Sequence, residues 1–246
     1  MARLTESSTR YHLIVAASPE ELARQAAEQI AAGIDLALAE RDRAQIALAG
    51  GETPRAAYSR LGGEHLPWER VDVLLGDERW VPADDPSSNA RMLRETLLAQ
   101  APASRARFHP VPTDRPSAEA SAMAYAAELA VLCPGRMPRF DVVLLGLGDD
   151  GHTASLFPGT AAPAVVDRPV TIGEGKGLPR ITLSAPVLSA ARRVIFLVSG
   201  AGKRQALARL LDPNEPAERT PARLVRPASE VLILADAAAA ADLPPH

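Results

Sequence analysis

The chain has 246 residues, of which 47% are hydrophobic, and its 27 basic and 30 acidic residues give a formal net charge of −3. This balance implies no broad basic face for nucleic acid and no acidic tail, and the length allows one large domain or two small ones. Cys133 is the single cysteine, so an internal disulfide is excluded, and we expect a buried structural thiol in a reducing compartment.

The polar N-terminal residues 1–10 contain no apolar signal segment. The longest strongly apolar runs, 194–198 and 231–235, are far shorter than the roughly 18 residues that a membrane span needs. We therefore expect a cytoplasmic protein with no membrane partner.

Short apolar runs recur along the chain and predict strands. Most of them are apolar throughout rather than alternating, which is typical of strands covered on both faces. They are His12–Ala16, Gln45–Ala49, Val71–Leu75, Phe140–Leu145, Arg193–Val198 and Val231–Leu234.

Helical signals lie between these runs. Ser18–Glu21 combines a Ser cap, a Pro and two acids, and the Ala/Leu/Glu-rich helix that it begins reaches about Glu40. Further helices are predicted at 116–132 and 203–211. Strand–helix alternation predicts a mostly parallel, doubly wound α/β sheet in a single domain over 1–246. The Pro-rich stretches are expected to be loops and the tail a short helix with a frayed end; they are 101–116, 158–169, 213–227 and 237–246.

In such sheets, ligands bind beyond the carboxyl ends of the strands. After the second strand, Gly50 and Gly51 allow a tight turn, and Thr53 can cap a helix with Pro54 in its first turn. The free N–H groups of such a helix start can bind an anion, although the turn can equally be an ordinary connection.

After the third strand, Asp77, Glu78 and Arg79 follow an apolar run directly. Three charged residues are not expected inside a sheet, so we expect them at its rim, either solvated or lining a site. Ser87–Asn89 precede another predicted helix start, which places a second helix terminus near the same side.

The segment Gly146–Gly159 contains G-x-G-x-x-G after a strand, and Asp167 lies where a ribose-binding acid would be. Two features oppose dinucleotide binding. Asp149–Asp150 would place negative charge beside a pyrophosphate, and the helix expected after Gly151 would end at Pro158 after about seven residues, too short for a crossover.

The other interpretation is a glycine-rich loop that directs Asp150 and His152 at a ligand. Histidine is the side chain most readily poised for proton transfer near neutral pH, and an adjacent carboxylate can orient it. A histidine satisfied by local hydrogen bonds is the alternative. No His or Cys pair has metal-ligand spacing, and no G-x-S-x-G elbow occurs. The other histidines are expected to be structural or surface residues: His12, His65, His109 and His246.

After the fifth run, Ser199–Lys203 resembles half a phosphate loop. Arg204 and Leu197 occupy places where the full motif needs Ser or Thr and Gly, so nucleotide triphosphate use is not expected. We expect instead a lysine that reaches a simple sugar phosphate.

Together these loops resemble the 6-phosphogluconolactonase family. The matching stretches occur in the family's order and span nearly the whole chain, and Gly146–Gly159 is the most specific of them. The others are Ala49–Pro54, Gly76–Pro82, Ser87–Asn89, Arg180–Leu183 and Ser199–Lys203.

The resemblance implies a modified Rossmann-like fold, as in the glucosamine-6-phosphate deaminase superfamily. It also implies hydrolysis of 6-phospho-D-glucono-1,5-lactone without metal or organic cofactor. His152 would be the general base, oriented by Asp150, and N–H groups of the glycine loop could stabilise the oxyanion. The implied positions for the phosphate and substrate are Gly50, Gly51, Thr53, Asp77, Arg79, Asn89, Gly148, Gly151, Arg180 and Lys203.

One departure is Glu52, where many family members have Ser; we expect its side chain to point away from the phosphate. A deaminase or isomerase of the same superfamily is a rival, but Arg79 stands where the deaminases carry an aromatic residue. A non-catalytic sugar-phosphate sensor is a second rival. Such sensors usually carry a helix-turn-helix segment, and strands that begin by about residue 12 leave no room for one. The expected partner is a small sugar phosphate. We expect the protein to be a monomer or a weak homo-oligomer.

Overall fold

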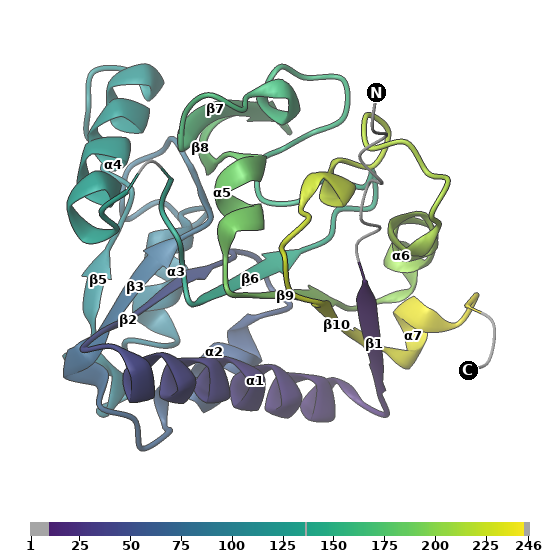
Figure 1. Ribbon diagram of the computed structural model, residues 1–246, viewed down its shortest axis with the longest axis horizontal. Coiled ribbons are helices and arrows are strands. Elements are labelled where there is room, and N and C mark those ends of the chain that lie inside the picture. Colours follow the sequence, from purple (N-terminus) through teal and green to yellow (C-terminus); the bar gives the residue numbers. More distant parts are fainter. Residues whose placement is uncertain (1–9, 136, 244–246) are drawn as a thin grey trace, which may run out of the picture.

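Seven parallel strands form the main sheet of the computed structural model, which describes residues 10–135 and 137–243. Their order across the sheet is β1-β10-β9-β6-β2-β3-β5, and every neighbouring pair is parallel. The predicted doubly wound sheet is therefore confirmed (Figure 1). The strands are β1 (Tyr11–Ala16), β2 (Ala44–Leu48), β3 (Val71–Leu75), β5 (Arg107–His109), β6 (Val142–Gly146), β9 (Arg193–Val198) and β10 (Val231–Asp236).

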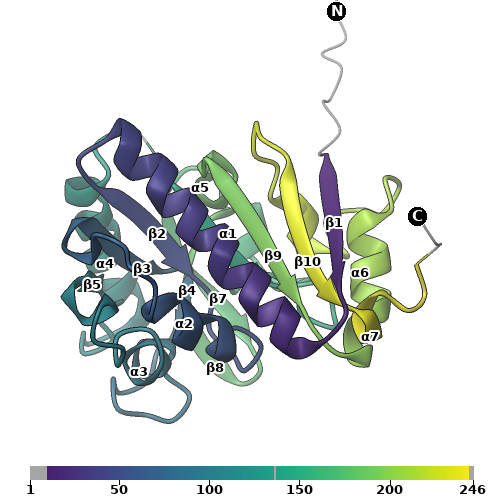
Figure 2. The same cartoon turned by 90° about the horizontal axis from the view of Figure 1, so that it is seen from below.

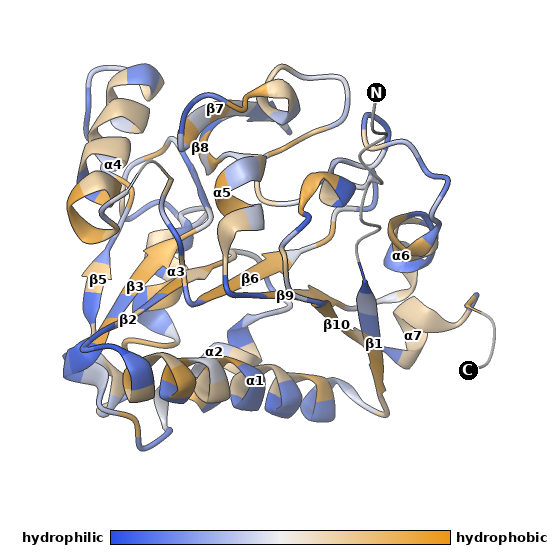
Figure 3. Ribbon diagram, in the orientation of Figure 1, coloured by the Kyte–Doolittle hydropathy of each residue, from blue (hydrophilic) through white to orange (hydrophobic). Residues whose placement is uncertain are grey.

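Helices cover both faces of this sheet. In Figure 1, α1 lies below it and α5 above it. Figure 3 shows the central strands in hydrophobic colours and the outer side of α1 in hydrophilic ones, as expected for a sheet buried on both faces. The helices are α1 (Pro19–Glu40), α2 (Arg55–Gly62), α3 (Asn89–Glu95), α4 (Ala118–Leu132), α5 (Ala185–Ala190), α6 (Arg204–Leu211) and α7 (Ala237–Ala240).

The first helix is long because of the strand order. The chain leaves β1 at the sheet edge and must pass β10, β9 and β6 to reach β2. Figure 2 shows α1 lying over the sheet between β2 and β9. Its 22 residues span about 33 Å. As predicted, Ser18 caps it, because its hydroxyl accepts the N–H of Glu21 at 3.2 Å.

A second, smaller sheet was not predicted. It is antiparallel and consists of β4 (Asp77–Arg79), β8 (Leu178–Leu183) and β7 (Val170–Gly175) in that order. The expectation that three consecutive charged residues cannot lie in a sheet was wrong, because β4 contains them. Their charges are tolerated because neighbouring segments supply hydrogen-bond and ion-pair partners.

Three local predictions were also wrong. The predicted loop 101–116 contains β5, a three-residue edge strand too short and polar to give a sequence signal. No helix follows Gly151; the chain forms tight turns closed by a Thr153–Leu156 bridge. Finally, α2 begins at Arg55 without a side-chain cap, so Thr53 does not cap it.

At the chain's C-terminal end, α7 is the short helix that was predicted, while residues 244–246 lie outside the described residues. Within the described ranges, the helices are all too short or too polar to cross a membrane.

The strand order also fixes where a crevice forms. From β2 the chain proceeds outward to β3 and β5, whereas from β6 it proceeds the other way to β9 and β10. The loops after the adjacent strands β2 and β6 therefore diverge, which opens a crevice at the carboxyl end of the sheet.

Candidate active site

A cavity of about 250 Å³ occupies this crevice. Larger cavities of about 650 and 850 Å³ lie elsewhere, but only this one gathers the glycine-rich loops that follow β2, β6 and β9. Ten of the twelve residues predicted for the site line it: Gly50, Gly51, Thr53, Asp77, Arg79, Asn89, Gly148, His152, Arg180 and Lys203.

The remaining two predicted residues lie behind this lining. Asp150 contacts His152, with 2.5 Å between a carboxylate oxygen and the ring Nδ1. The same oxygen accepts the backbone N–H of His152 at 3.0 Å. Gly151 has φ +92° and accepts the N–H of Ala222 through its carbonyl at 3.0 Å. It therefore shapes the loop rather than the cavity wall.

The Asp150 contact sets the role of each ring nitrogen. An ionised carboxylate can only accept, so Nδ1 carries the proton and donates it to Asp150. Nε2 is then the unprotonated nitrogen, the one that can accept a proton. His152 lines the cavity with its side chain 15% exposed, so this nitrogen has access to a ligand.

Gly148 is required by the close packing of this loop. A Cβ at that position would lie 2.0 Å from Nδ1 of His152, so no larger residue fits. The Gly148 N–H donates to the carbonyl of His152 at 2.8 Å, and the Gly151 N–H donates to the carbonyl of Gly148 at 3.0 Å. Both N–H groups are thus engaged within the loop, so neither of these two is free to bind an oxyanion.

An aromatic residue that the sequence analysis missed packs on the histidine. The Phe157 ring centroid lies 4.2 Å from that of His152, and the Arg180 guanidinium lies 5.4 Å from the Phe157 centroid on a cation–π contact. Burial, the largest influence, lowers the pKa of His152; the Asp150 carboxylate opposes this and Lys176 adds to it. The imidazole is therefore neutral at neutral pH, as a general base must be.

The pKa of the Asp150 carboxyl group is also lowered, but for a different reason. Burial raises its pKa, but hydrogen bonds from the backbone and ring of His152 outweigh that effect, so the pKa lies below its ordinary value. Asp150 therefore stays ionised wherever His152 is functional and can stabilise the imidazolium that proton transfer creates.

The cavity wall from the small sheet is a network around Asp77. Ser155 donates to its carboxylate at 2.5 Å, and the Arg180 guanidinium lies 3.8 Å away. Asp77, Ser155 and Arg180 are all buried. This network explains how β4 carries an acidic residue, and Ser155 is a second residue that sequence reasoning missed.

Asn89 and Arg79 each present a buried polar atom without a protein partner among the described residues: the Asn89 side-chain oxygen and the Arg79 Nε. The Asn89 amide donates to the Asp77 carbonyl at 2.8 Å, and Arg79 donates to the Ser87 carbonyl. A Cβ on Gly50 would lie 1.8 Å from the Asn89 oxygen, so this glycine is needed for the close approach. Buried unpartnered polar atoms in a cavity are suited to a polar ligand.

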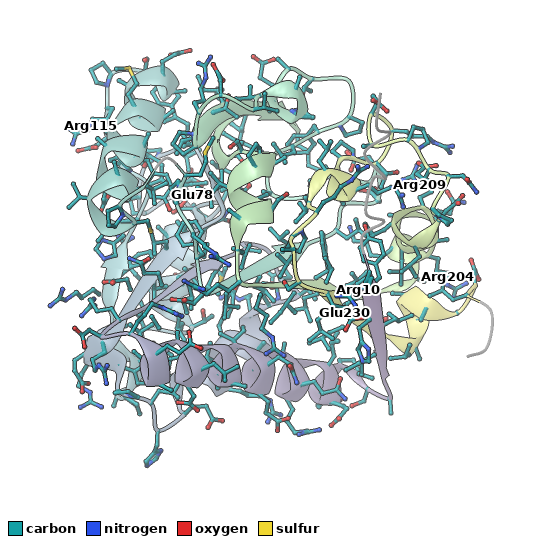
Figure 4. The ribbon with its side chains drawn as sticks, in the orientation of Figure 1. Arg10, Glu78, Arg115, Arg204, Arg209 and Glu230 are labelled. Atoms are coloured by element: carbon teal, nitrogen blue, oxygen red, sulfur yellow. The ribbon has the colours of Figure 1, made fainter. Side chains whose placement is uncertain are left out.

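Glu78 is not at a solvated rim but 1% exposed in the interior, where Figure 4 labels it. Its carboxylate accepts the N–H groups of Arg79, Asn89 and Ala90 at 2.7 to 2.8 Å and the Ser88 hydroxyl at 3.1 Å. Glu78 thus fixes the start of α3 and with it Asn89.

Glu52 behaves as expected. Its side chain is 91% exposed and lies 3.8 Å from Arg55. The residue belongs to the cavity rim, but its charge is spread into solvent rather than directed at a buried anion.

The described residues contain no group of three or more His, Cys, Asp or Glu arranged to hold a metal ion. Among the other histidines, His109 lies between Asp72 and Glu128 at 3.1 and 2.8 Å and does not line the cavity. It joins β3 to α4, as expected of a structural residue. Cys133 is buried, and burial raises its thiol pKa to about 11, so it is an inert structural thiol.

Residues 17–234 match the family described as glucosamine-6-phosphate isomerases/6-phosphogluconolactonase. The chain belongs to this family. A 6-phosphogluconolactonase from Synechocystis sp. is 45% identical over 215 residues, covering 86% of this chain and 90% of that protein. The solved structure of 6-phosphogluconolactonase from Trypanosoma brucei superposes with a TM-score of 0.86 at 35% identity, covering 96% of this chain and all of the other.

A second solved structure bears on the fold. A monomeric glucosamine-6-phosphate deaminase superposes with a TM-score of 0.79 at 23% identity, covering 93% of this chain and 98% of the other. The fold is thus shared with that deaminase, while the family description itself names two activities. The resemblance inferred from the loop motifs is confirmed. The side chains of the site decide which of these chemistries a member of the family performs.

Proposed function

We propose that this protein hydrolyses 6-phospho-D-glucono-1,5-lactone to 6-phospho-D-gluconate, in the oxidative pentose phosphate pathway. The observation that carries the proposal is the His152–Asp150 pair, which opens on a cavity lined by Arg79, Arg180 and Lys203. A neutral imidazole serves to activate water, and the cations serve to hold a phosphorylated substrate. The names of the relatives at 45% and 35% identity support the same activity.

The phosphate binds to Lys203, Arg79 and the turn Gly50–Thr53. These groups come from three separate segments around the cavity: the loop after β2, strand β4 and the loop after β9. The unpartnered Arg79 Nε is a donor that a phosphate or hydroxyl oxygen can satisfy. Binding a remote phosphate in this way fixes the lactone ring relative to His152, so binding energy is converted into positioning.

His152 then acts as general base. Its Nε2 removes a proton from water while the water oxygen bonds to C1, and the carbonyl electron pair moves onto the carbonyl oxygen. The tetrahedral intermediate collapses, the bond from C1 to the ring oxygen breaks, and imidazolium returns the proton to the departing oxygen. The new carboxylic acid releases one proton, so water and lactone give carboxylate and H⁺. Base catalysis of this kind contributes about 10²–10⁴-fold.

We also propose that the reaction uses no metal or organic cofactor and that the protein works in the cytoplasm as a monomer or weak homo-oligomer. The single buried cysteine and the net charge of −3 support a reducing compartment and no nucleic-acid partner.

The test is a coupled assay with freshly made 6-phosphogluconolactone and 6-phosphogluconate dehydrogenase, measured against spontaneous hydrolysis. We expect NADPH formation well above the uncatalysed rate and no ammonia from glucosamine 6-phosphate. Ammonia release, or sugar-phosphate binding with no turnover at any pH, would replace the proposal with a deaminase or a sensor respectively.

A further inference from the structure

The chain uses almost no lysine. Of its 27 basic residues, 25 are arginine and only Lys176 and Lys203 are lysine. Both lysines line the same cavity. Lysine carries a compact, strongly hydrated point charge that arginine does not reproduce. The other basic side chains are all arginine, so the only two lysine side chains of the sequence both lie at the candidate active site.

Lys176 sits at the tip of the β7–β8 hairpin. Gly175 pairs with Leu178, so Lys176 and Gly177 form a two-residue turn, and their φ values are +55° and +77°. Two positive φ values define a type I′ turn, which favours Asn, Asp or Gly at its first position. Lysine is a poor choice for the turn itself, so its presence points to a use for the side chain.

The hairpin is seated closely on the loop that carries His152. A Cβ on Gly173 would lie 2.3 Å from the Ser155 carbonyl, and one on Gly175 would lie 2.3 Å from the Phe157 ring. Phe157 in turn packs on the imidazole. Two glycines on one strand therefore bring the turn close to the catalytic loop.

The Lys176 ammonium makes no hydrogen bond or ion pair within the described parts of the chain, 10–135 and 137–243. Its charge nevertheless acts on the catalytic pair, because it lowers the pKa of both His152 and Asp150. An unpaired cation near His152 is suited to form an ion pair with a negatively charged group of the ligand.

We propose that Lys176 is a substrate-binding residue for the C1 end of the lactone, where its ammonium group pairs with the oxyanion of the tetrahedral intermediate and then with the product carboxylate. This inference rests on the proposed function. The reaction as written puts one negative charge on the C1 oxygen, and the N–H groups of Gly148 and Gly151 are already engaged. Lys203 remains the cation for the phosphate.

A pair of inhibitors separates the two lysines. 6-Phosphogluconate carries a phosphate and a carboxylate, whereas glucitol 6-phosphate carries the phosphate alone. Lys176→Asn removes the charge with a residue that the type I′ turn prefers, so the hairpin is retained. We expect it to weaken 6-phosphogluconate binding about ten-fold or more, and glucitol 6-phosphate binding less than about two-fold. Lys203→Met should weaken both.

The same variant should lower kcat for the lactone by about ten-fold or more, since the oxyanion forms after binding. Glu174→Gln, an exposed change on the same hairpin outside the cavity, is the control and should alter neither measurement. Equal weakening of both inhibitors by Lys176→Asn, or unchanged 6-phosphogluconate binding, overturns the inference. Absence of lactone hydrolysis in the unmodified protein would instead overturn the proposed function. Calorimetric binding of the two inhibitors tests the role of Lys176 without turnover, so failure of the inference and failure of the proposed function can be told apart.

Discussion

At the scale of single residues, the site depends on one imidazole held between opposing influences. Burial, to which the Phe157 ring contributes, lowers the pKa of His152, and the Asp150 carboxylate raises it. The net result is a base that is free of its proton at neutral pH but still paired with a carboxylate that can stabilise the charged form. The catalytic role proposed for these residues can be tested directly.

Replacement of His152 by Ala should lower kcat about 10²–10⁴-fold, because the general base is lost. Binding of glucitol 6-phosphate should stay close to normal, since the phosphate is held by other groups. His12, whose side chain is 56% exposed and lies outside this cavity, is the matched control, and His12→Ala should leave the rate unchanged. Near-normal turnover in the His152 variant would contradict the mechanism.

The pH profile tests Asp150. In the unmodified protein, kcat/KM should fall as pH drops through the pKa of His152, which lies below 6.5. Asp150 raises that pKa, so Asp150→Asn should lower it further and move the acid limb of the profile to lower pH. The plateau rate should also fall, by about ten-fold or more, as the imidazolium loses its carboxylate. An acid limb that stays in place or moves upward would be inconsistent with this pairing.

At the scale of elements, the β7–β8 hairpin is the part of the fold that completes the site. The main sheet supplies the glycine-rich loops, and the small sheet supplies Arg180 and Lys176 and supports Phe157. The contact between the hairpin and the loop that carries His152 depends on Gly173 and Gly175, which leave room for that loop. A side chain at either position should therefore affect stability and catalysis together.

Gly175→Ala is the sharper of the two changes, because its methyl group would lie 2.3 Å from the Phe157 ring. We expect a loss of about 1–3 kcal/mol in the free energy of unfolding, measured in urea, together with a lower kcat as Phe157 is displaced from His152. Glu174→Ala, on the same strand but exposed, should change neither. An unaltered urea midpoint for Gly175→Ala would show that the hairpin is not seated in this way.

At the scale of the whole molecule, the strand order gathers residues that are far apart in the chain. The loops after β2, β6 and β9 carry Gly50, His152 and Lys203 to one crevice because the connections diverge between β2 and β6. The cavity exists only when the sheet is complete, so a ligand of this cavity binds the folded state alone.

Ligand binding should therefore stabilise the protein against heat. At about 100 times its dissociation constant, 6-phosphogluconate adds about 2.7 kcal/mol to the free energy of unfolding, which raises Tm by roughly 5–10 °C for a chain of this size. Gluconate without the phosphate should have a much smaller effect at the same concentration. Equal shifts from both compounds in a thermal melt would argue against the phosphate site at Lys203.

The main sheet was predictable because buried parallel strands leave uninterrupted apolar runs, and six of its seven strands were found in that way. The small sheet was not predicted from the sequence, for a physical reason. Its strand β4 is made of charged residues whose partners, Ser155, Arg180 and the first N–H groups of α3, come from elsewhere in the chain. No local sequence pattern predicts a strand that is stabilised by such distant partners.

The sequence by itself determined the α/β class, the parallel strands and the loops that carry glycine, histidine and phosphate-binding residue types, because each follows from hydropathy or local backbone chemistry. Only the tertiary structure decided that Glu78 is buried at a helix start, that Phe157 packs on His152, and that Lys176 lies near the His152–Asp150 pair. These facts depend on contacts between distant segments, and such contacts are set by the packing of the two sheets rather than by any one stretch of chain.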